Sequence, residues 1–206
     1  MRRVVSAVAA TVGSMVAAVP GASAATDHQF ESWTSKAEAT FSTCVKTTQV
    51  GEHCEDWVLR ATKITDPDGS KSLLVVAQFD VEITAAGPVR KLKGSGAART
   101  AVSMDSKPTS ASAKATVSML GNCTPAGCTR SSIYVDIKWT GVGVTTADSG
   151  GSIQDAGTCR VETSWDSRVR EATATAKVGV KSFASTAAQK PPSMSVYHEE
   201  YGAVCK

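Results

Sequence analysis

One stretch of the chain, residues 72–84, constrains the fold more than any other. Its sequence, SLLVVAQFDVEIT, begins with an apolar run and then alternates strictly. Phe79, Val81 and Ile83 fall on one side of an extended chain, and polar residues fall on the other. A period of two is that of a β-strand with one face against a core. The apolar run, residues 73–77, predicts a segment that is covered on both sides.

The rest of the chain repeats this pattern in short segments separated by residues typical of turns. The further predicted strands are residues 41–49, 54–65, 97–105, 111–120, 132–146, 158–165, 170–180 and 194–204. Trp57 and Trp139 fall on the apolar sides of their strands, so we expect both in the core. Roughly nine strands without intervening helices predict an all-β fold, either an antiparallel β-sandwich or a barrel.

Three segments fit this pattern less well. In residues 25–39, Phe30, Trp33 and Ala37 have helical spacing, which predicts a short helix or, alternatively, a loose arm. Residues 85–96 carry a basic group that suits a loop or a solvated edge strand. Residues 147–157 are rich in Gly, Asp and Ser and are predicted to form a loop.

The N-terminus has the anatomy of a secretory signal peptide. Arg2 and Arg3 precede an apolar stretch, residues 4–19, and Ala22-Ser23-Ala24 is a cleavage site of small residues. A membrane anchor fits less well, because the stretch is shorter than the usual ~20 residues and contains polar positions. We expect cleavage after Ala24, secretion, and a single all-β domain over residues 25–206 with no further transmembrane segment.

The size and charge of the chain that remains after the predicted cleavage limit the classes of partner that we expect it to bind. Without the first 24 residues, 182 of the 206 remain, enough to bury roughly 70% of the unfolded surface. Loss of Arg2 and Arg3 leaves 20 basic residues against 19 acidic ones. This balance gives no electrostatic reason to bind nucleic acid or an anionic membrane. We expect a monomer.

Six cysteines follow the predicted cleavage site, and an even number in an oxidising compartment predicts disulfides. Fifteen pairings are possible in principle. Proximity in the sequence favours Cys44–Cys54, Cys123–Cys128 and Cys159–Cys205, of which the last closes the longest loop and would contribute roughly 4 kcal/mol. Metal ligation is the competing interpretation, but the spacings lack C-x-x-C pairs and the chain has three histidines. We expect no metal and no cofactor.

Two strands in the last third of the chain carry a recognisable pattern. They contain Trp139-Thr140-Gly141-Val142-Gly143 and the run from Arg168 to Ala176. The pattern resembles small exported β proteins of high-GC Gram-positive bacteria, in which W-x-G-x-G is followed by R-x-A-T-A-x-G. This chain departs from the pattern in two places. Glu171 stands between Arg170 and Ala172, and Ala176-Lys177 stand where a glycine is usual. The resemblance implies a secreted bacterial all-β protein and carries over no catalytic residue.

Signatures of catalysis are mostly absent from the sequence. There is no G-x-S-x-G motif and no dinucleotide fingerprint, and His198-Glu199-Glu200 lacks the second histidine of a zinc protease helix. Asp80 or Glu82 with Asp136 could form a glycosidase pair from separate strands, but all three lie on predicted polar faces, where solvation or ion pairing explains them. We therefore expect no catalytic residues.

Aromatic residues are the best candidates for a binding site. Trp165 lies among polar residues and is predicted to be exposed, and Tyr197, His198 and Tyr201 could join it. We expect a secreted, non-catalytic protein with a binding or structural role, whose ligand is a cell-envelope glycan or another secreted protein. The alternatives are a secreted hydrolase with a carboxylate-based site and a secreted toxin or inhibitor.

Overall fold

The structure, a computed structural model, describes residues 28–46, 52–84, 86–125, 127–185 and 191–205. These residues form eleven strands in one antiparallel sheet and contain no helix, which confirms the predicted all-β class. None of them forms a helix long and apolar enough to cross a bilayer. The predicted signal peptide, residues 1–24, lies outside the described part of the chain.

The strands follow one another along the chain with short connections. They are β1 (His28–Lys46), β2 (Glu52–Asp66), β3 (Gly69–Thr84), β4 (Gly87–Arg99), β5 (Val102–Met104), β6 (Ser110–Thr124), β7 (Gly127–Gly141), β8 (Thr146–Ala156), β9 (Cys159–Val178), β10 (Lys181–Ala184) and β11 (Ser193–Cys205).

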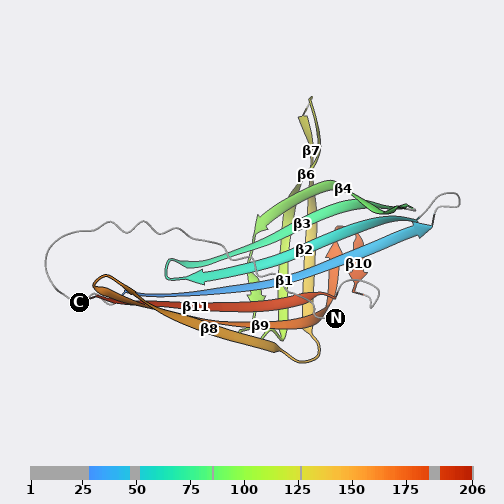
Figure 1. Cartoon of the computed structure of the whole chain (residues 1–206). Helices are drawn as coiled ribbons and strands as arrows, with labels where there is room; N and C mark the ends of the chain where they lie inside the picture. The colour runs from blue at the N-terminus through green and yellow to red at the C-terminus, as the bar shows by residue number, and fades with distance from the viewer. Residues whose placement is uncertain (1–27, 47–51, 85, 126, 186–190, 206) are drawn as a thin grey trace.

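The sheet closes on itself because β9 changes partners along its length. Residues 159–171 of β9 pair with β11, and residues 172–178 pair with β7. At the other side, residues 94–96 of β4 pair with β6. The strands β9, β11, β1, β2, β3, β4, β6 and β7 therefore form a closed circuit. Figure 1 shows β6, β7 and β10 running across the direction of β1, β2 and β3.

The core lies between β1, β2 and β3 on one side and β6, β7 and the last part of β9 on the other. Its buried residues include Ala37, Ala39, Phe41, Trp57, Leu59, Ala61, Leu74 and Val76 from β1 to β3, and Ala111, Ala113, Val117, Met119, Val135, Ile137, Trp139, Ala172, Ala174, Ala176 and Val178 from β6, β7 and β9. The predicted core positions of Trp57 and Trp139 are confirmed. The many alanines let the two layers approach closely around the few large side chains, each of which contributes roughly 1.5–3 kcal/mol by burial.

Several details differ from the sequence predictions. Residues 28–39 belong to β1 and are not helical, because pairing with β2 and β11 satisfies the backbone on both edges and overrides the helical spacing. Residues 147–157 lie almost entirely in β8, which pairs along its whole length with β9 although all its side chains are exposed. The segments 158–165 and 170–180 form one strand, and Val180 lies exposed beyond its end.

The central stretch also differs from expectation, whereas the basic segment confirms one of its two predicted alternatives. In β3, Leu74 and Val76 are buried while Leu73 is 38% exposed, so only one face of the apolar run is covered. The basic segment is part of β4, whose residues 87–92 pair with β3 alone and form an edge of the sheet, as predicted.

All three predicted disulfides are present: Cys44–Cys54, Cys123–Cys128 and Cys159–Cys205. Each links two directly paired residues of neighbouring strands, β1 with β2, β6 with β7, and β9 with β11. The disulfides are therefore placed along strand pairs rather than inside the core cluster.

The corner at which β4 meets β6 provides a test of the closed circuit. A Cβ at Gly96 would overlap the backbone carbonyl oxygen of Ser118, whereas a Cβ at Gly202 in β11 would meet nothing within 4 Å. Gly96→Ala should therefore lower the free energy of unfolding by about 1–3 kcal/mol, and the matched variant Gly202→Ala should change it by less than ~0.5 kcal/mol. Urea unfolding measures both. Equal stability of the two variants would contradict the close approach of β4 to β6 at Gly96.

Candidate functional site

Beyond the core, β1, β11, β9 and β8 continue as a single layer, away from β6 and β7 (Figure 1). Both faces of this layer are open to ligands, since none of its residues 29–36 of β1 or 146–156 of β8 is buried. Directly paired residues of neighbouring strands share a face, and consecutive residues alternate between faces. The two faces therefore carry different sets of side chains.

One face points away from the core and carries an aromatic strip, formed by Phe30, Trp165, Tyr197 and Tyr201. The rings of Trp165 and Tyr197 lie stacked with centroids 6.3 Å apart. Tyr201 is directly paired with Phe30 of β1. Phe30, Tyr197 and Tyr201 are 44%, 36% and 38% exposed. The three aromatic residues that the sequence singled out thus lie on one face, joined by Phe30, for which the sequence predicts a short helix or a loose arm.

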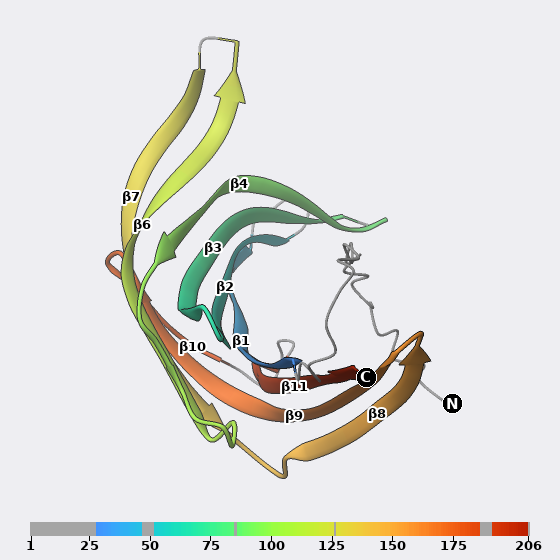
Figure 2. The ribbon, with the colours of Figure 1, turned by 90° about the vertical axis from the view of Figure 1, so that its left-hand side faces the viewer.

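The strip lies on the inner side of a curved sheet. Figure 2 shows β4, β3, β2, β1, β11, β9 and β8 following a curve, with β6 and β7 on its outer side. Side chains that point away from β6 and β7 therefore line the inner side. A ligand bound along the strip would contact several strands at once.

A glycine in the neighbouring strand makes room for Trp165. Gly150 of β8 is directly paired with Trp165, and a Cβ there would lie 2.9 Å from the indole ring. The ring therefore lies over the bare backbone of β8. This position leaves Trp165 half-buried, less exposed than predicted.

The hydroxyl of Tyr197 is available as a hydrogen-bonding group in the strip. Burial raises the pKa of Tyr197 above its usual value, and the negative charge of Glu199 adds to the rise. The phenol therefore remains protonated at neutral pH and can both donate and accept a hydrogen bond.

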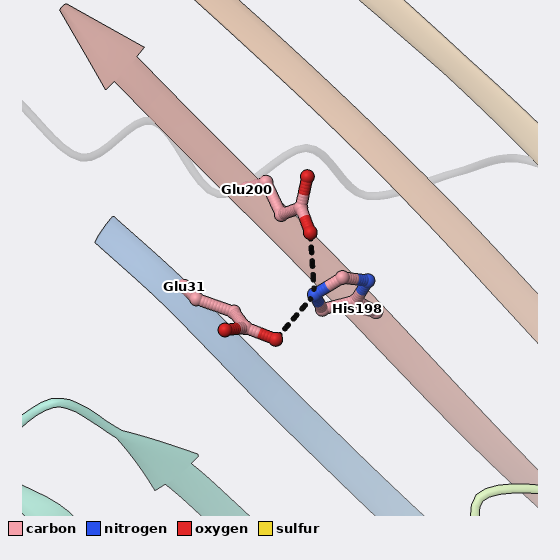
Figure 3. A group of neighbouring side chains, drawn as sticks. All are labelled: Glu31, His198 and Glu200. Atoms are coloured by element: carbon pink, nitrogen blue, oxygen red, sulfur yellow. Dashed lines mark hydrogen bonds and ion pairs between the residues drawn. The ribbon is translucent and has the colours of Figure 1, made fainter. Parts of the chain in front are cut away.

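The opposite face of the same strands carries a polar cluster, which we call the His198 cluster: Glu31, Asp166, His198 and Glu200. The Nε2 atom of His198 lies 3.1 Å from Oε1 of Glu31 and 3.6 Å from Oε1 of Glu200 (Figure 3). The Nδ1 atom lies 3.0 Å from Oδ1 of Asp166. One imidazole is thus bordered by three carboxylates.

Strand register assembles this cluster from three strands. His198 and Glu200 are two residues apart on β11 and so share a face. Glu31 of β1 is directly paired with Glu200, and Asp166 of β9 with His198. The expectation that His198 joins Tyr197 and Tyr201 is wrong, because His198 lies on the other face. The signal in the sequence was the spacing His-x-Glu in an alternating strand.

Trp33 holds the imidazole from one side. Its ring stacks on that of His198 with centroids 3.8 Å apart and an interplanar angle of 15°. Its Nε1 also donates a hydrogen bond of 2.8 Å to Oε1 of Glu31. Trp33 therefore fixes the ring plane and one of the carboxylates together.

The His198 cluster contains atoms suited to hold a metal ion. The three ligand atoms of Glu31, His198 and Glu200 all lie within 4.8 Å of one another. The expectation of no metal rested on spacing in the sequence, whereas these ligands are brought together by strand pairing. The six cysteines are all in disulfides and are not available as ligands.

The acids considered for a glycosidase pair are engaged elsewhere. Asp80 lies 3.2 Å from the amine of Lys93 and 3.7 Å from His53. Asp136 lies 3.1 Å from the amine of Lys114. These two acids form ion pairs, as predicted, and Glu82 is exposed.

Comparison with models of protein families, with curated proteins and with solved structures finds no match. The resemblance to small exported bacterial β proteins therefore stays a prediction.

Substitution at Gly150 tests the position of Trp165. In Gly150→Val the new side chain occupies the space of the indole, so the ring should turn into solvent and lose its stacking on Tyr197. We expect tryptophan emission to shift to longer wavelength, with a loss of stability near 1 kcal/mol, the typical contribution of an aromatic pair. Ser152→Ala, on the same face of β8, is the matched control. An unchanged spectrum in Gly150→Val would contradict this placement.

Proposed function

We propose that this protein is exported and binds an extended carbohydrate, such as a glycan of the cell envelope, along the aromatic strip. The observation that carries the proposal is the grouping of Trp165, Tyr197, Tyr201 and Phe30 as partly exposed rings on the inner side of a curved single-layer sheet. The role is binding, without a chemical step.

The export part of the proposal rests on two features. Residues 1–24 have the pattern of a signal peptide. All six cysteines form disulfides, which persist in oxidising compartments such as the extracellular space. Both features support secretion of the remaining chain.

The choice of a carbohydrate rests on the mixture of side chains in the strip. Aromatic rings offer flat apolar surfaces to the C–H faces of sugar rings. The residues paired with them are mostly polar: Thr34 and Ser167 flank Tyr197, Thr163 flanks Tyr201, and Glu199 flanks Trp165. Hydroxyl and carboxylate groups between rings can bind sugar hydroxyls, whereas a protein partner would favour a more continuous apolar centre.

The length of the strip favours a chain over a single sugar. Tyr197 and Tyr201 are four residues apart on one strand, which corresponds to about 13 Å at the usual rise per residue. Trp165 extends the strip towards β8. An oligosaccharide lying across β11 and β9 would contact several rings.

A hydrolytic role has less support. Asp80 and Asp136 are neutralised by lysines, and no contact brings them together among the described residues. Glu31, Asp166 and Glu200 border one imidazole on the face opposite the strip. Glu31, Asp166 and Glu200 therefore do not lie beside the rings of the strip.

Titration with soluble glycans and cell-wall fragments tests the proposal by tryptophan fluorescence. At least one glycan should bind saturably, and Trp165→Ala should weaken it at least tenfold, the usual cost of removing an aromatic anchor. Trp33→Phe, which changes a tryptophan of the opposite face, should leave the affinity unchanged. Isothermal titration calorimetry should reproduce the same order of affinities.

Two results would overturn the proposal. One is the absence of binding across the panel, and the other is equal affinity of the wild-type protein and Trp165→Ala. Release of reducing ends from a bound glycan would support the hydrolase alternative instead.

A further inference from the structure

We propose that Glu31, His198 and Glu200 bind one divalent cation of the first transition row, and that Zn²⁺ is the ion they suit best. The site lies on the face opposite the aromatic strip and is independent of glycan binding. Its ligands come from two neighbouring strands, β1 and β11, with supporting contacts from β9.

The distances between the ligand atoms match a small coordination sphere. Two ligands about 2.0–2.1 Å from a tetrahedral zinc ion lie roughly 3.3 Å apart. The Nε2 atom of His198 lies 3.1 Å from Oε1 of Glu31 and 3.6 Å from Oε1 of Glu200. Small rotations of the two carboxylates would allow all three atoms to bind one ion, with water completing its coordination.

The three ligand residues differ in exposure: His198 is mostly buried, whereas Glu31 and Glu200 are accessible to solvent. The side chain of His198 is 12% exposed, whereas those of Glu31 and Glu200 are 54% and 50% exposed. As Figure 3 shows, both carboxylates point toward Nε2 from adjacent strands. An ion can therefore enter from solvent and meet an imidazole that is already held in place.

The partners of the ligands support metal binding by the Nε2 atom. Asp166 lies 3.0 Å from Nδ1 of His198, so it can accept the Nδ1 proton and leave the lone pair of Nε2 for an ion. Ser164 Oγ donates a hydrogen bond of 3.4 Å to Oε2 of Glu200, the oxygen that faces away from the imidazole. Metal-binding histidines commonly have a carboxylate in this position.

The charges of the cluster also favour a cation. With a neutral imidazole, Glu31, Asp166 and Glu200 contribute three negative charges. Arg168, whose Nε lies 3.5 Å from Oδ2 of Asp166, offsets one of them. The resulting charge of −2 is balanced by one divalent ion. The competing explanation of the same contacts is ion pairing between the imidazole and these carboxylates without an ion.

The types of ligand select among ions. Ca²⁺ and Mg²⁺ prefer sites made entirely of oxygen ligands. An imidazole nitrogen shifts preference to first-row transition ions, and two carboxylates are common companions of histidine around Zn²⁺. Since Glu31 and His198 belong to different strands, the ion would also link β1 to β11.

Titration of the purified, tag-free protein with ZnCl₂ alone tests the proposal. We expect saturable 1:1 binding by isothermal titration calorimetry, a change in tryptophan emission because Trp33 stacks on the ligand imidazole, and a rise in the thermal midpoint that EDTA reverses. MgCl₂ should bind at least tenfold more weakly.

Variants separate this site from other histidines and acids. Glu31→Gln and Glu200→Gln, both at exposed positions, should each weaken Zn²⁺ binding at least tenfold, and Asp166→Asn should weaken it by 10- to 100-fold through the histidine. Glu199→Gln, the neighbouring acid on the other face, and His53→Gln should leave the affinity unchanged. Circular dichroism confirms that each variant is folded.

The metal site would be overturned if the wild-type protein showed no saturable Zn²⁺ binding at millimolar concentration. It would also be overturned if Glu31→Gln and Glu200→Gln bound Zn²⁺ as the wild type does. Lower thermal stability of these two variants in EDTA, with unchanged Zn²⁺ affinity, would assign the cluster to an imidazolium held by carboxylates.

Discussion

The structure depends on the backbone pairing of one strand, β9, with different neighbours at its two ends. Its first part pairs with β11 and β8, and its last part pairs with β7 and β10. The last part closes the circuit of strands around the core, while the first part extends beyond it. The chain therefore has a two-layered end that provides stability and a single-layered end with two accessible faces.

Both proposed binding surfaces follow from the single-layered end. Because consecutive residues of a strand point to opposite faces, neighbours such as Tyr197 and His198 serve different surfaces. The inner face presents aromatic rings, of which Trp165 lies over the bare backbone of Gly150, and the outer face gathers carboxylates around one imidazole. A shift of register by one residue would mix the two sets, so the register determines both sites.

The sequence predicted what depends on local alternation and on proximity in the chain. The core positions of Trp57 and Trp139 and the three disulfides are examples. It failed for β8, whose polar side chains give no alternation and whose existence depends on hydrogen bonds to β9. It also failed for the start of β1, where helical spacing competed with strand pairing.

The residues of the candidate sites divide in the same way, into those that the local sequence identifies and those that only strand pairing identifies. Trp165, Tyr197 and Tyr201 could be chosen from residue type and polar surroundings. Phe30, Glu31 and Asp166 could not, because their roles require knowing which residue of β1 and β9 lies beside which residue of β11. That information resides in contacts between residues more than 30 positions apart in the sequence.

The register of β11 against β1 and β9 is thus the central claim, and nuclear Overhauser effects between backbone protons of an isotopically labelled sample test it most directly. The account predicts cross-strand contacts between Trp33 and His198, between Glu31 and Glu200, and between His198 and Asp166. A complete set of direct pairs displaced by one residue, with Trp33 opposite Tyr197 and Glu31 opposite Glu199, would contradict it.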